Sequence, residues 1–106
     1  MKQKTKEHCK IEKKGSFGKK WKVDSIKVKA TDDNEVTWTC DDSDFMIWFP
    51  PDWNPLVGTN QSGKTRLFTA QVRQDVSPGQ VYQYSIFCYA DNEMAEGNSP
   101  PTMIIE

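Results

Sequence analysis

Short runs in which apolar and polar side chains alternate are the feature that most restricts the fold of this sequence. The clearest run covers residues 81–89, where one set of alternate positions holds Tyr82, Tyr84, Ile86 and Cys88. Gln83 and Ser85 lie between them. A period of two places successive side chains on opposite faces of a β-strand. The turn sequence Ser-Pro-Gly at 77–79 precedes the run, so we predict a half-buried strand here.

The rest of the chain repeats this pattern between turn sequences. We predict further strands within 26–30, 36–40, 45–49, 68–72 and 102–105. The run 45–49 is apolar at every position, which is typical of a strand covered from both sides. We find no amphipathic segment of helical length. The sequence therefore predicts an all-β fold, an antiparallel or mixed Greek-key β-sandwich.

With 106 residues the chain has the length of one domain. Residues 1–20 are polar and lysine-rich, and Ile11 and Phe17 are their sizeable apolar side chains. We predict a flexible basic arm over 1–20, or alternatively a loosely held first strand, and a single β-sandwich domain over 21–106.

The charge balance argues against a polyanionic partner. The net charge is −1, and the lysine-rich first third lacks the arginines and interleaved aromatics that read nucleic-acid bases. We expect no nucleic-acid binding.

No run approaches the roughly 18 apolar residues of a membrane span. We also see no signal-like apolar segment near Met1. As written the chain is expected in the cytoplasm, or outside it if a signal peptide has been removed.

Several segments together resemble the cupredoxin family, over about residues 23–106. They are Glu-Val-Thr-Trp-Thr at 35–39, the acidic loop 41–44, the apolar run through Phe49, the turn at 77–79 and Tyr-Gln-Tyr-Ser-Ile-Phe-Cys at 82–88. The segment 94–102 resembles the ending of small bacterial proteins of that fold. The resemblance implies a cupredoxin-like sandwich, with Cys88 at the position of the copper thiolate and Met94 near the axial ligand.

The two copper histidines of the family have no counterpart in this sequence. Asp44 or Phe45 stands near the first histidine position, and the one histidine, His8, lies in the N-terminal segment. Type 1 copper needs two imidazoles and a thiolate around a weak axial ligand. The resemblance therefore implies the fold without a copper centre, and we expect no cofactor.

An immunoglobulin- or fibronectin-like sandwich is the alternative fold. Trp38, Cys40, Tyr84 and Cys88 fit its pattern of core tryptophan, tyrosine and cysteines in part. However, immunoglobulin domains place the tryptophan well after the first cysteine, whereas Trp38 precedes Cys40 on one strand. Parallel pairing between the first strand and a later one would favour the cupredoxin arrangement.

Cys40 and Cys88 each end a predicted strand, and both ends fall at the same pole of a cupredoxin-like sandwich. Three interpretations stay open: two buried thiols, a disulfide, or a pair of soft-metal ligands. In the last case the thioether of Met94 or Met46 would complete a Cu(I) site.

The loop over 48–58 is the most aromatic stretch and the candidate for binding a protein partner. Its candidate contact residues are Trp48, Phe49, Trp53 and Leu56. Aromatic side chains on an anchored loop bury much area at a small entropic cost. The alternative is that the loop folds back and caps the core.

No arrangement of catalytic side chains is visible in the sequence. His8 has no partner nearby in the sequence, no serine has a nucleophile-elbow context, and glycine-rich phosphate motifs are absent. We therefore predict a non-enzymatic, cupredoxin-like binding or structural module without a type 1 copper site. The alternatives are a Cu(I) or redox protein using Cys88, Cys40 and Met94, and an immunoglobulin-like adhesion module.

Overall fold

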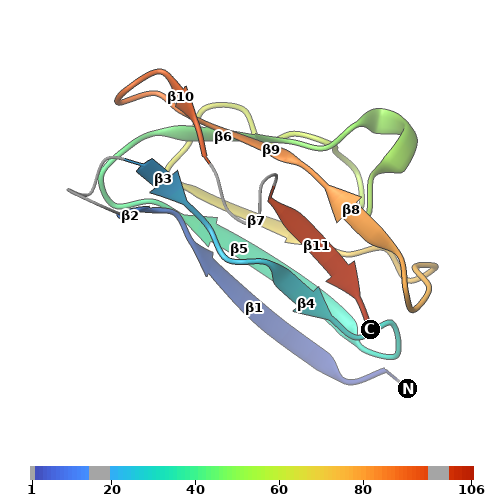
Figure 1. The fold of residues 1–106 in the computed structure, drawn as a ribbon. Helices are drawn as coiled ribbons and strands as arrows, with labels where there is room; N and C mark the ends of the chain where they lie inside the picture. The colour runs from blue at the N-terminus through green and yellow to red at the C-terminus, as the bar shows by residue number, and fades with distance from the viewer. Residues whose placement is uncertain (1, 15–19, 96–100) are drawn as a thin grey trace.

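The computed structural model describes residues 2–14, 20–95 and 101–106, and the described chain is built mainly from β-strands (Figure 1). In chain order the strands are β1 (Lys4–Lys10), β2 (Glu12–Lys14), β3 (Lys20–Lys22), β4 (Ile26–Val28), β5 (Asp33–Thr39), β6 (Phe45–Trp48), β7 (Leu67–Gln71), β8 (Val81–Gln83), β9 (Ser85–Cys88), β10 (Glu93–Met94) and β11 (Thr102–Ile105). One turn of 3₁₀ helix, η2 (Pro51–Trp53), follows β6. Within these residues no helix has the length and apolar character needed to cross a membrane.

The strands form two layers that face each other across the core. One layer has the order β1-β5-β7, in which β1 runs parallel to β5 and β7 antiparallel to it. The other contains β4-β11-β8 and β10-β9-β6. Strands β8 and β9 follow one another with a break at Tyr84, so they join these two sheets into one layer (Figure 1). The prediction of an all-β sandwich with mixed pairing is therefore confirmed.

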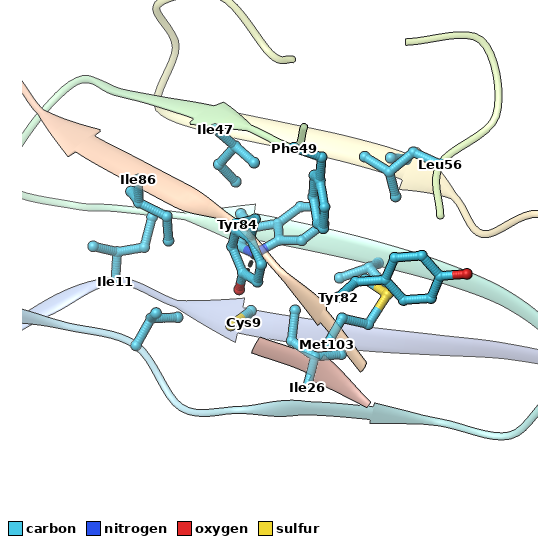
Figure 2. Close-up of a cluster of buried hydrophobic side chains, with 14 of the residues drawn as sticks. Cys9, Ile11, Ile26, Ile47, Phe49, Leu56, Tyr82, Tyr84, Ile86 and Met103 are labelled. Atoms are coloured by element: carbon cyan, nitrogen blue, oxygen red, sulfur yellow. Dashed lines mark hydrogen bonds between the residues drawn. The ribbon is translucent and has the colours of Figure 1, made fainter. Parts of the chain in front are cut away.

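Aromatic side chains from both layers meet at Trp38, in the middle of the core. Its ring stacks on Phe68, with centroids 5.7 Å apart, and meets Phe49 and Tyr84 edge-on at 6.4 and 5.9 Å. The Trp38 indole N–H donates a hydrogen bond of 3.2 Å to the Tyr84 hydroxyl (Figure 2). Burial of these rings supplies apolar contact, and the hydrogen bond satisfies the indole donor inside the core.

The N-terminal segment is part of the sandwich. β1 pairs with β5 over seven residues, from Lys4 opposite Asp33 to Lys10 opposite Thr39, and the side chains of Cys9 and Ile11 are buried. The predicted flexible basic arm over 1–20 is therefore wrong for residues 4–14, and the alternative of a first strand describes them. The lysines misled the prediction because they occupy the outer face of an edge strand, where charge also discourages pairing with other chains. Residues 15–19, including Phe17, lie outside the described part.

Strand β6 also differs from its prediction. Its alternate side chains Phe45 and Ile47 are fully buried, but Met46 is only half-buried and Trp48 keeps 38% of its surface exposed. The strand is thus covered on its inner face and open on its outer face. Its second apolar row lies at the surface.

Candidate functional site

Cys40 and Cys88 lie at the ends of β5 and β9 and are buried, 2% and 0% exposed. Both are free thiols, as is Cys9. Burial, followed by the proximity of Cys40, raises the pKa of Cys88 to about 12, so its thiol stays protonated at neutral pH. Of the three interpretations, the structure shows two buried thiols and no disulfide.

The cross-strand partner of Cys88 on β6 is Phe45, which is fully buried. An apolar ring therefore fills a position near which the resemblance places the first copper histidine. His8 lies on the outer face of β1, and its Nε2 shares a hydrogen bond of 2.7 Å with the Thr39 hydroxyl. Among the described residues, no three or more His, Cys, Asp or Glu side chains cluster in a way that would hold a metal ion.

Met94 is separated from the thiols by the sheet itself. In the β9–β10 pair Met94 lies opposite Phe87, and it lines the outer surface beside that ring with 52% of its own surface exposed. Cys88 is the next residue along β9, so its side chain points to the other face. The structure thus does not bring together the candidate ligand set Cys40, Cys88 and Met94.

The predicted partner-binding residues of the 48–58 loop divide into two groups. Phe49 and Leu56 are buried in the core, so they are not available as contacts. Trp53 stacks on Tyr82 with centroids 4.6 Å apart, and its indole N–H donates to the Val81 carbonyl at 2.7 Å. These three residues agree with the alternative in which the loop folds back onto the domain, because Phe49 and Leu56 pack in the core and Trp53 covers Tyr82 on β8. Trp48, in contrast, points outward from β6.

A row of apolar side chains crosses the outer face of β6, β9 and β10. Met46 and Met94 lie on either side of Phe87 in the strand register, and Trp48 lies opposite Ser85. Together these five residues line an open depression of about 240 Å³ whose surface is apolar. We call this depression the apolar groove. It includes Trp48 from the predicted set, and it adds Met46, Phe87 and Met94.

The outer face of the other layer is mostly polar, although Leu67 on β7 is 60% exposed there. There Lys6 lies opposite Glu35, and Glu35 lies opposite Gln71. Farther along the same face the hydroxyls of Thr37 and Thr69 share a hydrogen bond of 2.9 Å. Charged and hydroxyl side chains of this kind are typical of a sheet face that is exposed to solvent. The apolar groove differs from that surface because several apolar side chains adjoin one another in it, which makes it the candidate interaction site.

The edge of β6 beside the groove is already occupied by the loop that follows η2. The Phe45 N–H donates to the Thr65 carbonyl at 2.7 Å, and the Ser62 N–H donates to the Ile47 carbonyl at 2.9 Å. The Ile47 N–H donates in turn to the Ser62 hydroxyl at 2.8 Å. A ligand at the groove therefore meets side chains on this side, and it cannot add a strand to β6.

Positive charge lies at one end of the groove. Phe87 meets Tyr89 edge-on at 5.0 Å, and the Lys64 amine lies 4.8 Å from the centroid of the Tyr89 ring. Arg66 Nε and Lys64 Nζ approach the two carboxylate oxygens of Asp44 at 3.0 and 3.9 Å. Asp44 thus has two cationic partners, of which Lys64 is the more loosely held.

The signal for the groove was present in the sequence but was assigned to burial. The run 45–49 is apolar on both of its faces, and Phe87 breaks the polar half of the alternation in the last long strand. Only the pairing of β6 with β9 brings Met46 and Phe87 side by side. The chain matches no protein-family model and no curated protein.

Proposed function

We propose that this chain is a non-enzymatic, cupredoxin-like binding module that uses the apolar groove to hold a partner. The observation that carries the proposal is the row Met46, Phe87 and Met94, with Trp48 beside it, on the outer face of β6, β9 and β10. The outer face of the other layer is mostly polar, with Leu67 exposed on β7. Aromatic and methionine side chains are enriched in binding interfaces, and methionine adapts to ligands of different shape.

The pairing of the strands supports the cupredoxin-like arrangement over the immunoglobulin-like one. β1 runs parallel to β5, and β11 runs parallel to β4. Immunoglobulin sandwiches are built from antiparallel sheets, so an adhesion module of that type is the less favoured proposal.

The filling of the thiol pole supports a fold without type 1 copper. Phe45 occupies the place beside Cys88, and Met94 faces away from it. Addition of Cu(II) to the reduced protein should give no intense thiolate-to-copper band near roughly 600 nm. Cu(I) should bind the protein no more tightly than it binds the Cys40→Ser, Cys88→Ser double variant. A blue band, or Cu(I) binding that depends on the thiols, would favour the soft-metal alternative instead.

The binding proposal is tested by selecting random linear peptides, displayed on phage, against the immobilised protein. Peptides that bind the groove should lose their affinity for a Phe87→Ser variant and keep it for a Thr69→Ser variant, whose change lies on the outer face of the other layer. The proposal is overturned if the selected peptides bind the wild type and both variants equally, or if selection enriches none. Circular dichroism of both variants verifies that the sandwich is intact.

A further inference from the structure

The charge beside the apolar groove points to the chemistry of its occupant. Resting on the binding function proposed above, we propose that the groove takes a short extended peptide segment that carries a bulky apolar side chain and, two or three residues away, a carboxylate. The apolar side chain lies between Met46, Phe87 and Met94, and the carboxylate pairs with Lys64.

The size of the groove suits a short segment. Trp48 is 38% exposed and Met94 52% exposed, while Met46 and Phe87 are partly buried. Because a whole large aromatic side chain buries about 150–250 Å², four partly covered side chains offer on the order of 300 Å². A stable pair of proteins buries about 800 Å² on each partner. A second copy of this chain is therefore poorly matched to the groove, whereas a few peptide residues fit it.

The groove is lined by both rigid and adaptable side chains. The indole of Trp48 and the ring of Phe87 have few rotatable bonds and keep their shape, whereas the thioethers of Met46 and Met94 can adjust to branched, linear or aromatic groups. We therefore expect the apolar position of the peptide to accept several side chains, including Leu, Ile, Met and Phe.

Lys64 provides the polar contact at the Tyr89 end. Its amine lies over the Tyr89 ring, which in turn packs against Phe87, so the charge is one ring away from the groove. Its existing partner, Asp44, is 3.9 Å away and is already bound by Arg66 at 3.0 Å. The Tyr89 ring centroid lies 5.0 Å from that of Phe87 and 4.8 Å from the Lys64 amine. An extended chain advances about 3.3 Å per residue, so two or three residues of the peptide cover this distance between its apolar side chain and its carboxylate.

A membrane surface is a poorer match than a peptide. Each cation near an anionic bilayer contributes about 1 kcal/mol, so membrane-binding surfaces gather several of them. Here Asp44 offsets one of the two cations at this end. Glu93, next to Met94, adds an anion on the β10 side. The pKa of Lys13 in β2 is raised mainly by the hydrogen bond that its amine donates to Asp91 and less by the charge of Glu93.

The experiment measures the carboxylate contact by itself. The peptides selected above are sequenced, and one enriched peptide is synthesised with its acidic residue and with the matching amide. Fluorescence anisotropy then gives the affinity of both peptides for the wild type and for Lys64→Gln, with Lys6→Gln on the outer face of β1 as the matched control. A salt titration of the same complex follows.

We expect acidic residues to be enriched beside an apolar position. Removing either the peptide carboxylate or the Lys64 amine should weaken binding about two- to fivefold, as for one exposed ion pair, and removing both should cost no more than removing one. Added salt should reduce the difference. Lys6→Gln should have no effect.

Three results would overturn this inference. If the groove-dependent peptides lack an acidic residue, or if they bind the Lys64→Gln variant and the wild type with equal affinity, the proposed carboxylate contact is refuted and the binding function is kept. Binding to phosphatidylserine vesicles without peptide binding would replace the peptide by a membrane. A dimer in sedimentation that dissociates in the Phe87→Ser variant would assign the groove to a second copy. Equal peptide binding to Phe87→Ser would instead remove the proposed function itself.

Discussion

Replacing Tyr84 by Phe removes one oxygen atom from the centre of the core and tests how the two layers are held together. The Tyr84 hydroxyl accepts the indole N–H of Trp38 at 3.2 Å, and the two residues are 2% and 0% exposed. In the variant the indole donor stays buried without an acceptor, because water has no access to it. Leaving a buried donor unpaired costs about 1–3 kcal/mol of the free energy of unfolding.

That loss is a large fraction of the total stability of a domain, which is about 5–15 kcal/mol. For a chain of this size each 1 kcal/mol corresponds to a fall in Tm of about 4–8 °C. Urea denaturation followed by circular dichroism measures the effect, with an unchanged m-value showing that the unfolding transition is the same. The matched control is Tyr82→Phe, because the Tyr82 hydroxyl donates to Gln80 Oε1 at 2.9 Å near the surface. Water can replace that contact, so the control should change stability by less than about 0.5 kcal/mol.

A double-mutant cycle separates the hydrogen bond from the loss of packing. Trp38→Phe removes the donor and part of a ring, so its own cost includes a cavity. If the hydrogen bond matters, the Trp38→Phe, Tyr84→Phe double variant should be more stable than the sum of the single changes implies, because neither partner is then left unpaired. The reasoning is refuted if Tyr84→Phe is as stable as Tyr82→Phe, or if the cycle shows no coupling.

Three further predictions concern the pH dependence, the first strand and the antiparallel pair formed by β2 and β3. Burial raises the pKa of Cys9 and of Cys88 from 9.0 to about 12. Because the folded state keeps these two protons to higher pH than the unfolded chain does, their contribution to the free energy of unfolding is complete below pH 9 and is lost as the pH rises toward 12. Within this pH range each thiol adds about 1.4 kcal/mol per pH unit to the loss of unfolding free energy. Urea denaturation of the reduced protein should therefore show a smaller loss of stability with pH for Cys9→Ala than for the wild type; a urea midpoint that does not change with pH contradicts this. Ile11→Ala should cost about 2–5 kcal/mol in urea denaturation, because this side chain is 1% exposed; a loss below about 0.5 kcal/mol would show that the N-terminal segment is not part of the core. Asp91 accepts hydrogen bonds from the Lys13 amine and, at 2.9 Å, from the Trp21 indole. Asp91→Ala should therefore speed amide hydrogen exchange in the paired strands β2 and β3 and leave β5 protected; unchanged exchange in β2 and β3 would show that this contact does not hold them.

The local pattern of side chains was enough to identify most strands. Alternation placed Tyr82, Tyr84, Ile86 and Cys88 on one face of the run 81–89, and each of these is buried. Such predictions succeed because the two faces of a strand are decided by neighbours in the sequence. The fold class followed from the same pattern.

The N-terminal strand shows where local patterns fail. Its lysines suggested a solvated arm, yet β1 pairs along its whole length with a segment about 29 residues later, from Lys4 opposite Asp33 onward. Nothing within residues 4–10 identifies that partner, because the hydrogen-bonding groups of the backbone are the same in every sequence. Long-range pairing is decided by the packing of the whole chain.

The sequence by itself determined which side chains alternate, that two imidazoles for a type 1 copper site are lacking among its residues, and that the fold class is all-β. The tertiary structure alone decided the burial of those apolar side chains that the alternation left open. Phe49 and Leu56 went into the core, whereas Met46, Phe87 and Met94, from three different strands, came together on an outer face. The physical reason is that hydrophobic character favours burial without specifying against what, and the register between strands selects the neighbours.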